Sequence, residues 1–447
     1  MLSLLIMKGS DMFLETHKNT NIELLPELYE AYLAETNKDS KKSLGQYYTP
    51  EDVSKFIANE AVKLYEDGDN IADVCCGCGN LVVRLVEALQ KKIHIYLYDV
   101  DKTALKIARM RLNEYIEDEY IHVIEGDFLN DEISLPERTL TISNPPYGRP
   151  EKDYMFFQTS DTNNLYTLFT EKIVKQSKNC VLIIPQSFTS GEKYQSLRDV
   201  LSLYGGDCYC FDNVPATIFN GRKKGIFNTN TSNSVRTSFL IVNKKEKGYR
   251  LTHLLRFKNE ERERMFNSLQ SFLGSRKKDW MKVPSNLEHF VTDWLTNPFC
   301  VRDVIETKKE YQREDWKLTI PSTPRYYLSA VRSDLSRSSK IVIYAKSEEW
   351  FNALYLCLNS SVFYLWWRIR DGELTLKEND LLSFPIKNVQ SSYVEDLLSM
   401  EEEYIVTKKN AGKNNENVKF PEEVRNKINS LLDVPEEIKN IHKNCLF

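Results

Sequence analysis

The chain has 447 residues, of which 41% are hydrophobic and 11% are aromatic. This length exceeds the usual size of one domain, so we expect two folded domains rather than a disordered chain. No apolar run reaches about 18 residues, and the apolar stretch at residues 1–7 is too short for a signal peptide. We therefore expect a cytoplasmic protein without a membrane span.

The net charge of −4 argues mildly against a nucleic-acid partner, but the charge is unevenly distributed. Residues 221–282 contain 16 Lys and Arg against 5 Asp and Glu. Clustered cations are what a polyanion-binding surface needs, because they pair with phosphates. The alternative interpretation is a solvated basic helix.

Residues 1–42 are expected to form a short helical arm with Leu24, Leu25, Leu28 and Tyr29 on one face. From residue 43 to 245, short apolar runs alternate with amphipathic helices. Strands are predicted at 70–75, 93–98, 120–124, 140–143, 180–185, 208–211 and 237–242, and helices at 50–65, 81–89, 102–115, 165–176 and 194–203. This alternation indicates βαβ units and a mostly parallel sheet covered on both faces. A polar segment joins the last two strands, which suggests that one of them runs antiparallel.

The rhythm changes to charged, irregular segments beyond residue 246, which predicts a second domain over 246–447. The aromatic run 359–368 is expected to pack a core rather than to stack on bases. Residues 406–420 are rich in Lys and Asn and are expected to form a mobile loop before a final helix.

A glycine turn, Asp73-Val-Cys-Cys-Gly77-Cys-Gly79-Asn80, follows the first strand and opens a helix. Glycines at such a turn let the backbone approach a ligand closely, next to the helix N-terminus. Cys75 and Cys78 also have the spacing of half a zinc site, which Cys208 and Cys210 would complete. The turn explains the spacing better, so we expect no metal.

Acidic side chains stand at the ends of the next two strands. Asp99 lies about 25 residues beyond the turn, where a carboxylate accepts both hydrogens of a ribose diol. Asp127 and Phe128 follow the third strand and offer an acceptor and a ring to an adenine. A helix N-cap explains any one of these acids equally well. Their recurrence at successive strand ends favours a nucleoside-containing ligand.

Asn144-Pro145-Pro146-Tyr147 follows the fourth strand. The two prolines lack N–H donors, which leaves carbonyl oxygens free to accept. The Asn144 side-chain oxygen and the Pro145 carbonyl suit both hydrogens of one planar amino group, whose lone pair would then attack a sulfonium methyl. The Tyr147 ring offers a stacking surface to an extruded base. The alternative is a proline-rich loop without a catalytic role.

In this order the motifs resemble those of the amino-group DNA methyltransferases of γ type, over about residues 43–245. The resemblance implies a Rossmann-like class I methyltransferase domain with a mostly parallel seven-stranded sheet. It also implies a C-terminal α+β target-recognition domain and S-adenosylmethionine as the cofactor. The implied cofactor-binding residues are Tyr48, Thr49, Pro50, Asp73, Cys76, Gly77, Gly79, Asn80, Asp99, Asp127, Phe128 and Asn144.

Asn144, Pro145, Pro146 and Tyr147 match the catalytic tetrapeptide of this family, in a form that favours adenine N6 over cytosine N4. Val74 and Cys78 depart from the residues that are common in the turn, and both are compatible with it. Phe219 is the candidate for a second base-stacking aromatic, and a packed core phenylalanine is the alternative. The candidates for phosphate contacts are Arg222, Lys223 and Lys224.

The resemblance therefore implies a site-specific adenine N6 methyltransferase acting on a flipped-out nucleotide of double-stranded DNA. It implies a prokaryotic or phage-encoded system that is either restriction-linked or an orphan methylation system, and any restriction endonuclease partner is expected to be a separate chain. The alternatives are methylation of RNA or of a protein glutamine, and a non-catalytic DNA-binding subunit. The tetrapeptide and the acid at strand two are both intact, which argues against the last of these.

Overall fold

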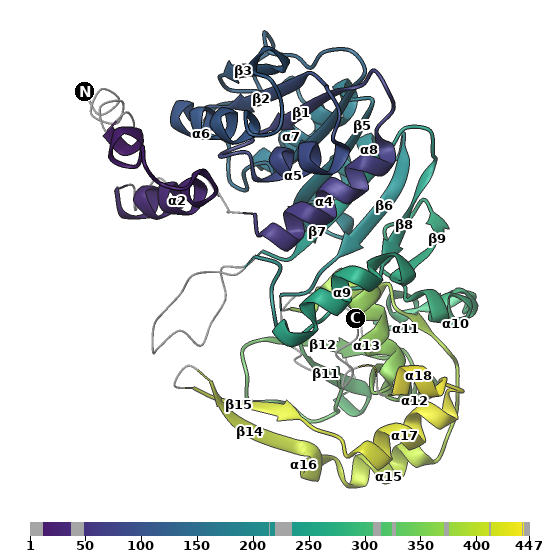
Figure 1. Cartoon of the computed structure of the whole chain (residues 1–447). Coiled ribbons are helices and arrows are strands. Elements are labelled where there is room, and N and C mark those ends of the chain that lie inside the picture. Colours follow the sequence, from purple (N-terminus) through teal and green to yellow (C-terminus); the bar gives the residue numbers. More distant parts are fainter. Residues whose placement is uncertain are drawn as a thin grey trace. The chain divides into compact units, whose positions relative to one another are not determined.

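The structure is a computed structural model that describes residues 12–36, 49–213, 215–219, 235–306, 314–323, 328–370, 375–410, 413–439 and 441. The chain divides into two compact units, Met1–Trp280 and Met281–Phe447 (Figure 1). Among the described residues, no helix has both the length and the apolar character that a membrane crossing needs.

A nine-stranded sheet with the order β3-β2-β1-β4-β5-β7-β6-β8-β9 forms the centre of the first unit. Its strands are β1 (Asn70–Val74), β2 (Ile95–Asp99), β3 (Ile121–Glu125), β4 (Thr139–Ser143), β5 (Asn179–Pro185), β6 (Gly205–Cys210), β7 (Thr237–Asn243), β8 (Gly248–Thr252) and β9 (Leu273–Lys277). The five strands from β3 to β5 are parallel, and β7 runs antiparallel between β5 and β6. The prediction of β1 to β7 is confirmed to within three residues at each end, as is the antiparallel strand near the end.

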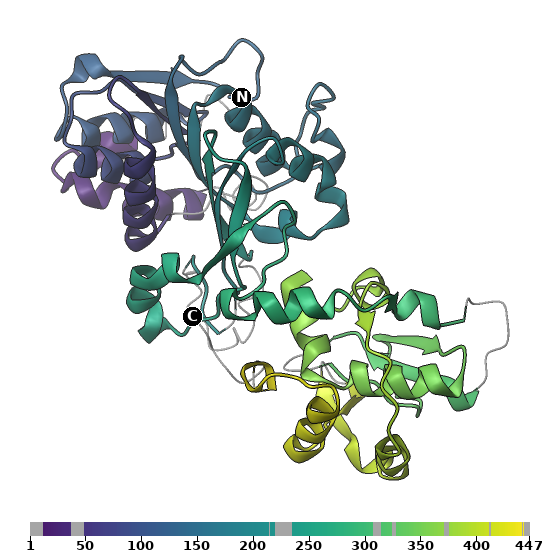
Figure 2. The ribbon, with the colours of Figure 1, turned by 90° about the vertical axis from the view of Figure 1, so that its right-hand side faces the viewer.

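Helices cover both faces of the sheet (Figures 1 and 2). They are α4 (Glu51–Leu64), α5 (Asn80–Leu89), α6 (Lys102–Leu112), α7 (Leu165–Gln176) and α8 (Gln195–Leu201). The strand order runs outward from β1 in one direction and from β4 in the other. Right-handed crossovers therefore place α5 and α6 on one face, and α7 and α8 on the opposite face. The reversal between β1 and β4 opens a crevice at the carboxyl ends of the strands, where ligands of such sheets bind.

The two glycines of the turn after β1 have different surroundings. Gly79 has φ +79°, and a Cβ there would lie 3.0 Å from the Cβ of Ala108 on α6. Both the backbone conformation and the close approach of α6 to the turn thus require glycine. Gly77 has φ +51°, and no atom lies within 4 Å of where its Cβ would be. The backbone at Gly77 therefore faces open space.

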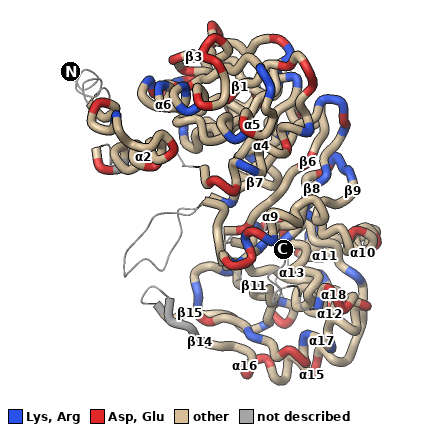
Figure 3. Tube along the Cα trace, in the orientation of Figure 1, with Lys and Arg blue, Asp and Glu red and all other residues tan. Residues whose placement is uncertain are grey.

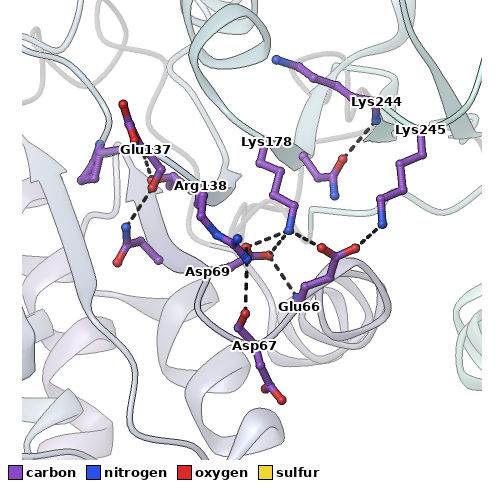
Figure 4. Close-up of polar contacts among 12 residues, drawn as sticks. Glu66, Asp67, Asp69, Glu137, Arg138, Lys178, Lys244 and Lys245 are labelled. Atoms are coloured by element: carbon purple, nitrogen blue, oxygen red, sulfur yellow. Dashed lines mark hydrogen bonds and ion pairs between the residues drawn. The ribbon is translucent and has the colours of Figure 1, made fainter.

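A network of ion pairs ties the amino ends of the parallel strands together (Figure 4). The Lys178 ammonium, at the start of β5, lies 2.6 Å from Glu66 and 2.7 and 2.8 Å from the two oxygens of Asp69. Arg138, before β4, lies 3.2 Å from Asp69, and Lys245, after β7, pairs with Glu66. Because the Asp69 side chain is fully buried, this acid depends on its cationic partners. The network lies at the edge of the sheet opposite the crevice.

The first unit ends later than the expected boundary at residue 245. Strand β8 pairs parallel with β6, and β9 pairs antiparallel with β8, so residues 248–277 extend the same sheet. The charged sequence that suggested a new domain belongs to the outer edge of this sheet, where the middle of β9 is exposed.

Many of the cations in the basic segment have partners inside the fold. Arg250 on β8 pairs with Asp207 of β6 at 2.7 Å, and Arg276 on β9 pairs with Glu246 at 2.7 Å. Figure 3 shows Lys and Arg (blue) interspersed with Asp and Glu (red) near β6, β8 and β9. Arg236 lies 2.9 Å from Asp212, and Arg262 pairs with Asp52. In the described part of the basic segment, these four arginines therefore form ion pairs within the fold. Fewer of the segment's cations are thus available to a polyanion than the charge count along the chain suggested.

The N-terminal arm contains a helical turn at residues 12–16, a 3₁₀ turn at Ile22–Leu24 and α2 (Leu25–Thr36). Leu25 and Tyr29 are buried, whereas Leu24 and Leu28 are 50% and 37% exposed. The expectation of one apolar face made by all four side chains is thus only half correct. The 3₁₀ turn that precedes α2 shifts Leu24 out of the helical register.

The second unit mixes short sheets with helices around one hydrophobic core. Its strands are β10 (Phe299–Cys300), β11 (Lys317–Pro321), β12 (Lys340–Tyr344), β13 (Pro385–Ile386), β14 (Ile405–Asn410) and β15 (Lys413–Val418). Its helices are α10 (Glu288–Trp294), α11 (Val301–Val304), α12 (Glu348–Leu358), α13 (Ser361–Arg370), α14 (Glu378–Leu382), α15 (Tyr393–Ser399), α16 (Glu401–Tyr404), α17 (Glu422–Leu431) and α18 (Glu436–Lys439). This arrangement is an α+β unit.

Two predictions for this unit have different outcomes. The aromatic run of α13 is buried, which confirms its place in the core, and Trp366 donates its indole hydrogen to the Asp380 carbonyl at 2.8 Å. The expected loop over 406–420 is wrong, because β14 and β15 pair there as an antiparallel hairpin. Little of the described part of the hairpin is buried, so its polar strands lack the alternation of apolar and polar residues that marks a half-buried strand. The sequence therefore resembled that of a loop.

Candidate active site

A pocket of about 410 Å³ lies in the crevice at the carboxyl ends of the strands of the first unit. Its walls come from the loop ends of β1 to β4, from the residues before α4 and from α2. The expected site residues that line it are Thr49, Asp73, Cys76, Gly77, Asn80, Asp99, Asp127, Phe128, Asn144 and Pro146. The strand order therefore brings together residues that are up to 97 positions apart in the sequence.

The glycine turn after β1 forms the floor of this pocket. The Gly77 N–H donates to Oδ2 of Asp99 at 2.8 Å, and the Cys76 N–H donates to the Tyr98 carbonyl at 3.1 Å. These bonds fasten the turn to the end of β2. Helix α5 begins at Asn80, so its N-terminus, with its positive end of the helix dipole, faces the pocket.

Asp73 is a buried carboxylate that lines the pocket, and neither of its oxygens has a well-formed hydrogen bond among the described residues, although the nearby Val82 N–H of α5 partly favours its charged form. Burial raises the pKa of Asp73 well above its usual range, and the nearby charge of Asp99 adds to this shift. A buried acid without partners costs folding free energy. The cost is offset when a ligand brings a cationic group or several N–H donors to this carboxylate.

The two other predicted acids of the pocket, Asp99 and Asp127, are already bound by the chain. Asp99 accepts from the N–H groups of Gly77 and Asp101, and burial raises its pKa to about 6. Asp127 accepts from the Leu129 N–H through Oδ1 at 3.0 Å and from the Tyr154 hydroxyl through Oδ2 at 2.8 Å. Each carboxylate keeps lone pairs for a ligand, and its orientation is fixed by these bonds.

Phe128 lies between the pocket and the core. Its side chain is 2% exposed, and it contacts Tyr98 edge-on and Phe169 in a stacked arrangement, with ring centroids 5.2 and 6.2 Å apart. The ring is thus held firmly by its neighbours. It lines the pocket beside Asp127, which is compatible with the expected contact to an adenine.

The amide of Asn144 is held in one orientation by its neighbours. Its Nδ2 donates to the Thr49 hydroxyl at 3.1 Å, and its Oδ1 accepts from the Tyr147 hydroxyl at 2.8 Å. The Tyr147 hydroxyl also lies 3.0 Å from the Ile183 carbonyl of β5. An amide oxygen has two lone pairs and can accept from two donors at once.

The remaining expected residues do not line this pocket. Pro50 directly precedes α4, and Gly79 lies close to Ala108 of α6. Pro145 is buried, and Tyr147 is partly buried against Tyr166. Phe219 is 6% exposed, which favours the packed alternative over a stacking surface. The residues of the prediction that lie outside the described part of the chain are Tyr48, Arg222, Lys223 and Lys224.

The zinc alternative gains no support from the described residues. They contain no group of three or more His, Cys, Asp or Glu side chains that suits a metal ion. Cys208 and Cys210 lie buried in β6, whereas Cys75 and Cys78 belong to the pocket wall at the end of β1.

Two groups of pocket residues were not predicted from the sequence. One is the segment after the tetrapeptide, where Lys152 lies 3.6 Å from Asp127 and Tyr154 bonds to the same carboxylate. The other is the arm, which contributes Tyr29, Glu30 and other side chains of α2. No spacing rule links either group to the strand ends. The one signal in the sequence was the helical periodicity of the arm, which indicated that one of its faces packs against another part of the protein.

Curated relatives match part of the chain. It is 27% identical over 190 residues to the type II methyltransferase M.VspI of Vibrio sp. (strain 343), covering 39% of this chain and 45% of the relative. It is 23% identical over 151 residues to the MpnII type I methylase subunit of Mycoplasma pneumoniae, covering 31% and 28%. The chain thus spans less than half the length of these relatives.

Among solved structures, the type I restriction-modification methyltransferase subunit of Streptococcus thermophilus matches with 18% identity and a TM-score of 0.41. The match covers 56% of this chain and 57% of that one. The family model described as N-6 DNA Methylase matches residues 20–292, which is more than half of the chain. The chain therefore belongs to the N-6 DNA methylase family.

Proposed function

We propose that this chain is a site-specific DNA methyltransferase that transfers a methyl group from S-adenosylmethionine to N6 of adenine. The observation that carries the proposal is the Asn144 amide, which is locked between Thr49 and Tyr147 at the wall of the pocket. This lock presents Oδ1 as an acceptor. An acceptor at this point suits an amino substrate rather than a hydroxyl or thiol that needs a base.

The pocket residues fit S-adenosylmethionine. The orphaned carboxylate of Asp73 suits the ammonium group of the methionine part, Asp99 suits the ribose diol, and Asp127 suits the adenine amino group. The volume of about 410 Å³ is in the range of small-molecule sites. When bound, the cofactor supplies an electrophilic methyl group on a sulfonium centre.

The residues of the tetrapeptide position the acceptor nitrogen. Asn144 Oδ1 and the Pro145 carbonyl accept one amino hydrogen each, which turns the nitrogen lone pair toward the methyl group. The rate enhancement then comes from positioning and from fixed dipoles, without a strong base. The Tyr147 ring supports an extruded adenine, whose extrusion costs a few kcal/mol of unstacking.

Membership of the N-6 DNA methylase family and the names of the relatives support DNA as the substrate over RNA or a protein glutamine. We assign target recognition to the second unit, since the segment after the sheet is where γ-type enzymes are expected to read their sites. A restriction endonuclease or a separate specificity subunit is a partner that fits this assignment. A DNA substrate fits the expected location in the cytoplasm of a prokaryote, for a chain that the cell or a phage encodes.

The test is single-molecule sequencing of DNA from a methylation-free host that expresses this chain, with Asn144→Ala as the control. N6-methyladenine at one short motif, absent from the control, is the expected result. Modified cytosine would correct the acceptor. Unmodified DNA, together with methylated RNA or protein in the same cells, would overturn the proposal.

A further inference from the structure

The N-terminal arm lies against α6, next to the ribose acid of the pocket. Phe13, Leu25 and Tyr29 of the arm form one apolar cluster with Ala104 and Ile107 of α6. The arm is thus packed against the catalytic fold through buried side chains rather than through surface contacts alone.

A hydrogen bond fixes the register of this contact. The Tyr29 hydroxyl lies 3.1 and 2.9 Å from the two oxygens of Asp101. Asp101 also caps α6 through the N–H groups of Thr103 and Ala104, and its own N–H donates to Asp99. A single side chain of the arm is therefore connected, through Asp101, to the acid that suits the ribose diol.

The second connection runs through one buried guanidinium. Arg111 of α6, whose side chain is 4% exposed, donates to the Cys78 carbonyl at 2.7 Å and to Oδ1 of Asn80 at 2.8 Å. It also pairs with Glu23 of the arm at 3.1 Å. Arg84 of α5 pairs with the same Glu23 at 3.2 Å. Arg111 thus holds the glycine turn and the arm in one place.

The arm forms part of the pocket itself. Four of its residues line the cavity, namely Pro26, Tyr29, Glu30 and Leu33. They face the end of the pocket that contains Cys78, Asp99 and Asp101. A ligand with its ribose at Asp99 would have the arm on one side and the glycine turn on the other.

We propose that the N-terminal arm is a wall of the cofactor site, which binds the ribose side of S-adenosylmethionine and slows its release. Arg111 is the positioning residue that couples this wall to the glycine turn. The proposal rests on the proposed function, since the ligand it assigns is the cofactor of that reaction. It extends the site to residues 26–33, which lie 37 to 44 positions before the start of β1.

The test compares Tyr29→Phe and Glu23→Gln with two matched controls in the full chain. Tyr115→Phe removes a hydroxyl from an exposed tyrosine just after α6, and Glu87→Gln removes a partner of Arg84 that is not part of the arm. Binding of S-adenosylmethionine and S-adenosylhomocysteine is measured by calorimetry, and release by stopped-flow competition. Each arm variant should weaken binding about threefold to tenfold, with faster release, because Tyr29→Phe loses the hydrogen bond to Asp101 and Glu23→Gln loses the ion pairs with Arg111 and Arg84. The controls should match wild type.

A second readout needs no cofactor. Cys78 packs against the arm cluster, so its alkylation rate, followed by mass spectrometry, reports whether the arm is docked. The arm variants should alkylate faster than wild type and the controls. Faster alkylation with unchanged affinity would overturn the proposal, because the arm would dock without serving the cofactor. Unchanged alkylation and affinity would overturn it as well.

Arg111→Lys separates positioning from folding, since it keeps the charge and loses the forked geometry. Its affinity for the cofactor should fall while its thermal unfolding midpoint stays within a few degrees of wild type. Wild-type protein that binds neither cofactor nor product would instead refute the proposed function. In that case a difference in alkylation rate would still show that the arm docks on the catalytic fold. The proposal that the arm binds the cofactor would then be refuted together with the proposed function.

Discussion

The hydroxyl of Tyr147 donates to Oδ1 of Asn144 across 2.8 Å, and the amide nitrogen of the same Asn144 donates to Thr49. In the proposed mechanism the tyrosine of the tetrapeptide therefore has two parts with different tasks. Its ring would offer a surface to the base, while its hydroxyl orients the amide that would receive the amino group. Thr49 comes from a motif 95 residues earlier in the chain, so the catalytic amide is held by two separate segments.

Tyr147→Phe should lower kcat by about tenfold, because the amide loses one of the two bonds that orient it. The affinity for S-adenosylmethionine should stay close to wild type. Single-turnover methylation of a DNA oligonucleotide at saturating cofactor measures the effect. Tyr147→Ala, which removes the ring as well, should lose clearly more. Equal losses in the two variants would show that the hydroxyl alone matters and that the ring does not support the base.

Asp73→Asn should stabilise the free protein while weakening cofactor binding. The folded-state pKa of Asp73 is raised, so its carboxylate disfavours folding increasingly as pH rises above the unfolded pKa, near 4. The asparagine should therefore add about 1 kcal/mol or more at pH 8, and the difference should shrink toward pH 4. Urea unfolding over this pH range measures it. If the variant were less stable than wild type at pH 8, the inference that the buried Asp73 carboxylate destabilises the free protein would be wrong.

Binding of S-adenosylmethionine should weaken as pH falls through about 6, the raised pKa of Asp99. The ionised form accepts both diol hydrogens, whereas the protonated form must donate one. Well below this pKa the dissociation constant should rise about tenfold for each pH unit. Calorimetry from pH 5 to 8 gives the profile, and Asp99→Asn should bind weakly with the inflection near 6 removed. An unchanged inflection in that variant would assign it to another group.

The strand ends show how much of the site can be read from the sequence. Asp73, Asp99, Asp127 and Asn144 each follow an apolar run, and the carboxyl ends of parallel strands meet at one edge of the sheet. Local patterns alone therefore predict which residues meet. The same patterns predict the fold, because βαβ units leave few topologies.

What the sequence could not predict depends on contacts between distant segments. Tyr154 reaches Asp127 across a loop, and Tyr29 reaches Asp101 across 72 positions, without any spacing that announces the contact. The partners of Arg250 and Arg276 were hidden for the same reason. A count of charges along the chain does not reveal which cations are paired across strands. The sequence of residues 221–282 therefore indicated a nucleic-acid surface, whereas many cations in the described part of this segment are paired within the fold.

Tyr154→Phe should reduce selectivity for the adenine of the cofactor. Its hydroxyl holds Oδ2 of Asp127, and without it the nearest partner of that oxygen is Lys152 at 3.6 Å. The affinity for S-adenosylmethionine should fall about twofold to tenfold. The affinity for an analogue with oxygen in place of the adenine amino group should change less. Tyr96→Phe, whose ring stacks on His122 and does not line the pocket, is the control. Parallel losses for both ligands would mean that Tyr154 only shapes the pocket.

Lys178→Met should destabilise the first unit by about 2–4 kcal/mol, because it removes the main cation of the fully buried Asp69. Lys91→Met, which removes the partner of the exposed Asp67, is the matched control and should have an effect near zero. The pKa of Glu66 is lowered to about 2 by Lys178 and Lys245, so the stability from the ion pairs of Glu66 is complete above about pH 4.5 and is lost as pH falls toward 2. Unfolding in urea at pH 7 and pH 3 should show a smaller difference between Lys178→Met and wild type at the lower pH. A difference that stays constant would place the effect in packing rather than in charge.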